Sequence, residues 1–296
     1  MHIDIDVGNA EQKRLIRKEL SILESAATGA GIIDQIERVA VPADFEGEVR
    51  RLTGDSEFRQ NRGYHLVLAK IVAGSKGTTI LISPVAFTEG FDTQIRVSWY
   101  VHELAHVDHN SRFPPRENES ATEKVYSENL HILFGDYAAE RCALETCAQL
   151  FDKPSDLYAE LHRSTCAAFM TALDDDQAYR ALAEAVVRFR LWRTDITGYQ
   201  RDVRPVFDRI SKSLAYAAAY IDSNTGFCED SPTFHEARFV THSARELASY
   251  FATKYQDADF DLADGAGLMK AFAKTFGFTY EDTDEGLYCR VVGLSI

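Results

Sequence analysis

The sequence lacks any apolar run of the about 20 residues that a membrane-spanning helix needs. Its first residues, Met1–Asp6, have neither the basic nor the apolar part of a signal peptide. The five cysteines are scattered and form no C-x-x-C pair. Cys142 and Cys147 fall inside an expected helix, where we expect them to be small packing groups in a reducing compartment. These absences predict a soluble cytoplasmic protein.

Positive charge is also scarce. The chain has 32 Lys and Arg against 46 Asp and Glu, which gives a formal net charge of −14. Nucleic acids and anionic membranes bind clustered cations, so we expect neither as a partner. A polypeptide substrate is compatible with this charge, and a regulatory protein is a second candidate partner. With 296 residues, 45% of them apolar, the chain is long enough for one large domain or two modest ones.

One motif stands out among the remaining features. Residues 102–106 read His-Glu-Leu-Ala-His, the H-E-x-x-H signature of zinc hydrolases. On a helix, His102 and His106 lie about 40° and about one turn apart, so both imidazoles can bind one ion. The opposite face is apolar and suited to burial: Val97, Tyr100, Val101, Leu104 and Val107. Glu103 lies beside the ligand face, where it can act as general base and acid on a zinc-activated water. The alternative is a surface helix whose histidines are four apart by chance.

The identity of the third zinc ligand is open at this stage. His109 shares the face, but on a straight helix it lies about 10 Å from His102 along the axis. Asp136 and Glu140 are four residues apart on a later expected helix, so both project from one face. Either one binds zinc while the other supports a ligand imidazole. Asp136 follows Gly135 and also resembles an N-cap; this and the longer reach of glutamate favour Glu140.

The combination of His-Glu-Leu-Ala-His with Glu140-x-x-Ala143 resembles the gluzincin-type metallopeptidases, and among them the intracellular ImmA/IrrE group. Leu150-Phe151 and Pro154 match the end of that group's ligand helix, whereas Leu144, Thr146 and Cys147 depart from its pattern. Across residues 60–154, the resemblance implies a minimal zincin core. It also implies that the strand Thr78–Ser83 is the sheet edge above the cleft; an internal strand is the plain alternative.

The pattern along the chain predicts an α+β fold with a small mixed sheet. We expect a zincin-like core over residues 1–154 and a helical domain over residues 155–296. Two strands, 65–72 and 78–83, are expected to form a hairpin across Ala73–Gly77. Asp174–Asp176 is expected to be a solvated turn and helix start. The expected helices are 11–29, 32–39, 130–151, 155–173, 177–194, 198–222, 235–254 and 266–276.

These features predict a zinc-dependent peptidase in which His102, His106 and Glu140 or Asp136 hold Zn²⁺ and Glu103 transfers the proton. A peptidase also needs a group that stabilises the oxyanion. Tyr137, Tyr220, His235 and His242 are nominal candidates, although single His and Tyr residues on helices are usually packing groups. The alternative function is a catalytically weak or latent regulatory protein that keeps a zincin core. A third alternative is a hydrolase that uses the same metal but acts on a substrate other than a peptide.

Overall fold

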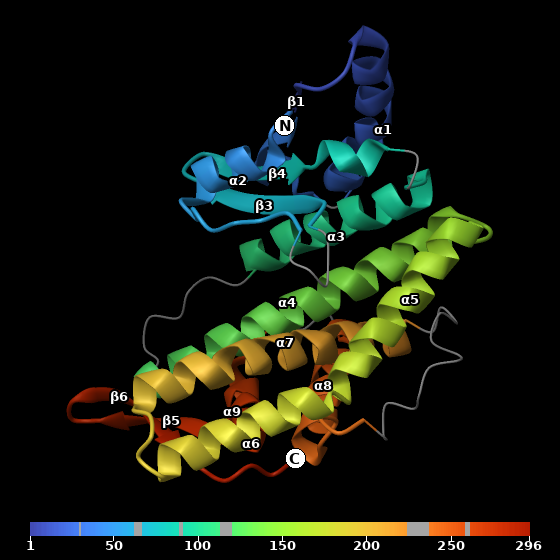
Figure 1. Cartoon of the computed structure of the whole chain (residues 1–296). Helices are drawn as coiled ribbons and strands as arrows, with labels where there is room; N and C mark the ends of the chain where they lie inside the picture. Colours follow the sequence, from blue (N-terminus) through green and yellow to red (C-terminus); the bar gives the residue numbers. More distant parts are fainter. Residues whose placement is uncertain (30, 62–66, 89–90, 113–119, 224–236, 258–260) are drawn as a thin grey trace. The chain divides into compact units, whose positions relative to one another are not determined.

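The computed structural model describes residues 1–296 except 30, 62–66, 89–90, 113–119, 224–236 and 258–260 (Figure 1). The fold is α+β. The strands are β1 (His2–Ile5), β2 (Ile36–Val41), β3 (Ala69–Gly74), β4 (Gly77–Ile82), β5 (Phe278–Thr283) and β6 (Gly286–Val291). The α-helices are α1 (Ala10–Gly29), α2 (Phe45–Thr53), α3 (Thr93–Arg112), α4 (Ala121–Leu150), α5 (Asp156–Leu173), α6 (Asp176–Arg190), α7 (Ile196–Asp222), α8 (His242–Gln256) and α9 (Ala266–Thr275).

The described residues divide into two compact units. The first unit comprises Met1–Arg112 and Cys142–Glu160, and the second comprises Phe113–Arg141 and Leu161–Ile296. Helices α4 and α5 each contribute residues to both units. The expected single division after residue 154 stays a prediction. It differs from this grouping because the first part of α4 packs with the later helices.

The first unit contains a four-stranded mixed sheet with the order β1-β2-β4-β3. β2 is parallel to both β1 and β4, and β3 is antiparallel to β4. The predicted hairpin is confirmed, with Gly74 paired to Gly77 around a two-residue turn. Gly77 has φ 143°, and a Cβ there would meet the Gln35 carbonyl oxygen at 2.9 Å, so the turn requires glycine. Of the predicted strand 65–72, residues 65 and 66 lie outside the described residues.

Two expectations about this sheet are wrong. β4 lies between β2 and β3, so Thr78–Ser83 is not the edge, and β3 occupies that position instead. The helix expected over 32–39 is a short 3-10 turn followed by β2, which buries Val39 between its two parallel neighbours. Apolar residues in this stretch fit helical spacing, but pairing with distant strands outweighs that local preference.

The two faces of the sheet pack against different helices because side chains alternate along a strand. Val39, Val41, Ile80 and Ile82 belong to one core with residues of α1 and α3. Ala40 and Leu81, one position out of phase, belong to a second core with Phe45 and Val49 of α2. Each fully buried Ile or Leu contributes about 1.5–3 kcal/mol, so the sheet holds α3 through its apolar face.

A part-buried polar cluster joins α1 to α3. The Arg96 guanidinium pairs with both oxygens of Glu19, with Nη2 to Oε2 at 2.9 Å. The Tyr100 hydroxyl donates to Glu19 Oε1 at 3.1 Å. Burial, and then the adjacent Glu19 carboxylate, raise the pKa of Tyr100. Arg96 and Tyr100 lie six and two residues before His102 on the same helix, so this cluster fixes the helix that carries both histidines.

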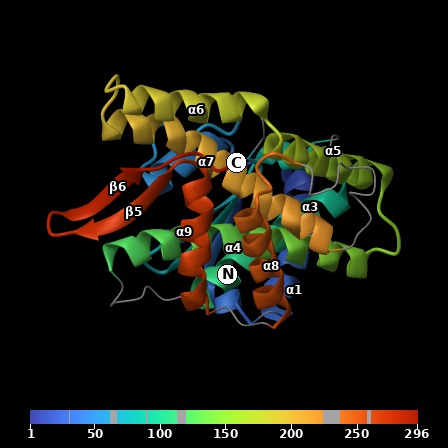
Figure 2. The same ribbon diagram turned by 90° about the horizontal axis from the view of Figure 1, so that it is seen from below.

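The second unit is built around α7, with most of its side chains toward the carboxy end buried. Helices α6 and α7 run side by side, and α8, α9 and the β5–β6 hairpin follow in succession (Figure 2). Phe207 of α7 contacts Phe272, Phe276 and Phe278 with ring centroids 5.1–6.0 Å apart. The β5–β6 hairpin was not foreseen. Asp175 caps α6 by accepting from Gln177 and Ala178 N–H, as predicted.

Helix α4 begins at Ala121, nine residues before the predicted start. Glycine in a helix interior costs about 1 kcal/mol, and here buried neighbours on both sides of Gly135 outweigh that cost. Cys142 and Cys147 are free thiols within α4, where they pack as expected, whereas Cys166 is disulfide-bonded, which is at odds with the expected reducing compartment. Among the described residues, every helix is too short or too polar to cross a bilayer.

Candidate metal centre

The two histidines of the motif lie on α3, one turn apart. Their Nε2 atoms approach to 3.1 Å, and their ring centroids are 4.8 Å apart. Both side chains are half-buried, so the rings are sheltered yet accessible. The apolar face of the same helix, with Tyr100, Leu104 and Val107, is buried in the first core. Burial of that face turns the histidines to the opposite side of α3.

The spacing of these nitrogens suits a tetrahedral zinc ion. Zinc binds imidazole nitrogen at about 2.0–2.1 Å, so two nitrogens on one tetrahedral ion lie about 3.3 Å apart. The observed 3.1 Å is close to that value. The imidazole pair therefore fits zinc with little rearrangement.

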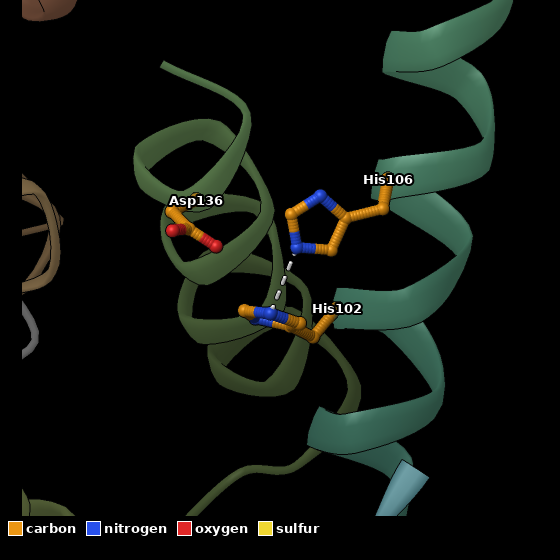
Figure 3. Close-up of side chains that lie close together, drawn as sticks. All are labelled: His102, His106 and Asp136. Atoms are coloured by element: carbon orange, nitrogen blue, oxygen red, sulfur yellow. Dashed lines mark hydrogen bonds between the residues drawn. The ribbon is translucent and has the colours of Figure 1, made fainter. Parts of the chain in front are cut away.

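A carboxylate from α4 completes a group of three. One ligand atom each from His102, His106 and Asp136 lie within 4.8 Å of one another (Figure 3). In Figure 3 both imidazoles and the carboxylate point toward a common region. Glu140, which the sequence favoured as ligand, is not in this group.

The surroundings of Asp136 resemble those of a supported ligand. Its side chain is 11% exposed. Tyr216 of α7 donates its O–H to Oδ1 at 3.3 Å, and the Lys212 ammonium lies 3.6 Å from Oδ2. Outer hydrogen bonds of this kind orient metal-binding carboxylates. Asp136 is not an N-cap, because it lies in the middle of α4.

A buried network in the second unit adjoins Asp136. Tyr137 is fully buried and donates its O–H to Asp222 Oδ2 at 2.8 Å. Arg141 Nη1 donates to the Tyr137 hydroxyl oxygen at 2.8 Å, and its guanidinium lies 4.5 Å from the centroid of the Tyr255 ring. Burial raises the pKa of Asp222, and the Tyr137 hydrogen bond lowers it in part. This network fixes the rotation of α4 against α7 and α8, and therefore the direction of Asp136.

Glu140 lies on the same helix as Asp136 but near a different group. Burial lowers the pKa of the His162 imidazole, and the charge of Glu140 opposes this shift in part. His162 is buried and shares a 2.6 Å hydrogen bond between its Nδ1 and the Tyr220 hydroxyl. Glu140 is itself half-buried. Glu140 therefore interacts electrostatically with His162.

The nominal oxyanion candidates have other contacts. Tyr137 donates to Asp222, and Tyr220 is bonded to His162. The side chain of His242 is 88% exposed and lies 3.4 Å from Glu246. His235 lies outside the described residues. Lys212 and Tyr216 were not foreseen from the sequence, although residues 212, 216 and 220 share one face of α7 by helical spacing.

The residues after the motif do not join the group. Helix α3 continues unbroken to Arg112, and Asp108 pairs with Arg112 at 2.8 Å. His109 is 4% exposed and packs into the protein. Glu103 is half-buried directly after His102. Glu103 is therefore the acidic residue of α3 that lies between the two histidines in the sequence.

Comparisons of the chain with protein-family models, with curated proteins and with solved structures found no match. Its function is therefore inferred from the chemistry of its own residues.

Proposed function

We propose that this chain is a zinc-dependent peptidase. His102, His106 and Asp136 would hold the ion, with Glu140 as the alternative carboxylate. The observation that carries the proposal is the 3.1 Å approach of the two Nε2 atoms beside a buried carboxylate. The likeness of the motif to gluzincin-type metallopeptidases supports the same function.

The chemistry divides between the ion and the chain. Bound zinc supplies Lewis acidity, which lowers the pKa of water and polarises a carbonyl group. Glu103 takes the proton of the attacking water and delivers it to the leaving amine. Tyr216 donates to Oδ1 of Asp136 and orients the carboxylate, and Oδ2, which lies beside the Lys212 ammonium, would bind the ion.

The test measures bound zinc and casein cleavage for the purified full chain. We expect Glu103→Gln to keep its zinc and to lose about 10²–10⁴-fold in cleavage, the usual contribution of a general base. Glu184→Gln, at a side chain 71% exposed on α6, is the matched control and should cleave like the wild type. Full cleavage by Glu103→Gln refutes the proposal.

A second comparison assigns the third ligand. Asp136→Asn should weaken zinc binding at least tenfold, whereas Glu140→Gln should leave it near the wild-type value. The reverse result assigns the ligand to Glu140. If neither change affects zinc binding, neither Asp136 nor Glu140 is a ligand.

One observation favours the second function, a latent protein with a zincin core. The Lys212 ammonium lies 3.6 Å from Asp136 and competes with a cation for that carboxylate. In a latent protein, Lys212→Met should tighten zinc binding and raise cleavage above the wild type. If Lys212→Met leaves both unchanged, the pair does not restrain the site.

A further inference from the structure

The carboxy end of α6 has an unusual residue at a position that normally holds glycine. Arg193 N–H donates to the Arg188 carbonyl at 2.9 Å, and Trp192 N–H donates to the Phe189 carbonyl at 3.0 Å. With Leu191 as C-cap, these two bonds form a Schellman motif. Its left-handed residue is Trp192, with φ 56°, and no other non-glycine residue in the described part of the chain has positive φ.

Tryptophan at this position destabilises the fold relative to glycine, which would form the same two hydrogen bonds. A bulky residue in the left-handed region is strained, because its Cβ crowds the backbone. The Trp192 side chain is also 93% exposed, so its burial does not offset that strain. Strain at an observed outlier points to a role outside the fold.

The residues around Trp192 form a mixed apolar and basic surface. Val187 and Leu191 are 52% and 55% exposed. Arg190 and Arg193 are exposed, and neither forms an ion pair within the described ranges, whereas Arg188 pairs with Asp202. No acidic residue occurs between positions 187 and 193, although the chain as a whole carries −14. We name this surface, formed by Val187, Arg190, Leu191, Trp192 and Arg193, the Trp192 turn.

We propose that the Trp192 turn is a docking site for an acidic segment of a partner polypeptide. An apolar side chain of that segment contacts Trp192 and Leu191, and flanking carboxylates pair with Arg190 and Arg193. Tryptophan and arginine are the residues that dominate binding energy in protein interfaces. Two available cations complement a short acidic peptide, whereas anionic lipid is typically bound by clusters of four to eight basic residues. The inference is independent of the zinc site.

The experiment selects binders from a displayed library of random 12-residue peptides against the full chain. We expect the enriched peptides to carry Asp or Glu on both sides of an aromatic or aliphatic residue. A synthetic copy should lose at least tenfold in affinity for Trp192→Gly, while the Tm of that variant rises by about 2–4 °C because the strain is removed. Arg190→Gln and Arg193→Gln should weaken binding and reduce its dependence on salt. Arg201→Gln, at a side chain 79% exposed on α7, is the matched control and should bind normally.

Four outcomes overturn the proposal. The first is that no enriched peptide is sensitive to Trp192→Gly, and the second is that the sensitive peptides lack acidic residues. The third is a Trp192-dependent association with vesicles of phosphatidylglycerol or with a second copy of this chain, in place of peptide binding. The fourth is a lower Tm for Trp192→Gly, which would show that Trp192 stabilises the fold.

Discussion

Replacing Tyr137 by Phe tests whether the buried network of α4 stabilises the second unit. The change removes one hydroxyl that accepts from Arg141 and donates to Asp222. The aromatic ring stays and keeps its contacts with Phe134 and Phe251, at centroid distances of 6.2 and 5.6 Å. The loss therefore reports the hydroxyl and not a cavity.

The magnitude follows from the two hydrogen bonds. Each joins the hydroxyl to a charged group in a buried site, and such bonds contribute about 1.5–3 kcal/mol. The full sum overstates the effect, because removing the hydroxyl also removes the cost of burying it. We expect the free energy of unfolding to fall by about 2–3 kcal/mol. Tyr288→Phe, at an exposed tyrosine on β6, is the control and should change it by less than about 0.5 kcal/mol.

The assay is urea unfolding followed by far-UV circular dichroism, repeated across pH. Burial raises the pKa of Asp222, so the folded state binds this proton more tightly than the unfolded chain does. Stability therefore falls as the pH rises from the usual aspartate pKa, about 4, through the raised value. Because Tyr137 lowers the pKa of Asp222, this fall should be larger in Tyr137→Phe, and Asp222→Asn should abolish it.

The reasoning is refuted if Tyr137→Phe costs less than about 0.5 kcal/mol with an unchanged urea slope. It is also refuted if Tyr137→Phe and Asp222→Asn are additive, since residues that share a hydrogen bond should be coupled. Weaker zinc binding by Tyr137→Phe would further support the role of the network in directing Asp136.

Two other predictions concern acid stability and metal. Hydrogen bonds from Arg51 and Arg38 lower the pKa of Glu48 to about 2, so stability should fall as pH drops from about 4.5 through 2. Solvent screening around the exposed Arg51 reduces the effect to about 1–2 kcal/mol. The free energy of unfolding is measured by urea titration at each pH, and Glu48→Gln should flatten its dependence on pH. An equally steep dependence in that variant contradicts the role of Glu48. Zinc at 100 times its Kd should stabilise the chain by about 2.7 kcal/mol in thermal unfolding, a chelator should reverse this, and His106→Ala should be insensitive to both. Zinc-dependent stabilisation of that variant would count against the site.

Local patterns account for the parts of the fold that were predicted. Helical spacing identified α3, and the glycine-rich turn identified the β3–β4 hairpin, because both are encoded by neighbouring residues. β2 was missed because its neighbours in the sheet, β1 and β4, are distant from it in the sequence, so no local pattern indicates that it pairs with them. The early start of α4 was missed because residues 121–129 are mostly polar, with Val125 and Tyr126 as their only large apolar side chains, so the helical spacing of apolar residues is weak there.

The amino-acid sequence by itself determined that His102 and His106 share one face of a helix with Glu103 beside them, since helical periodicity is a local property. It offered both Asp136 and Glu140 as the third ligand, because residues four apart project from the same face, and it favoured Glu140. Only the tertiary structure gives them different neighbours: the Tyr216 hydroxyl, 80 residues away, donates a hydrogen bond to Asp136, and the charge of Glu140 acts on His162. Packing of α7 against α4 makes that distinction, and no local pattern records it.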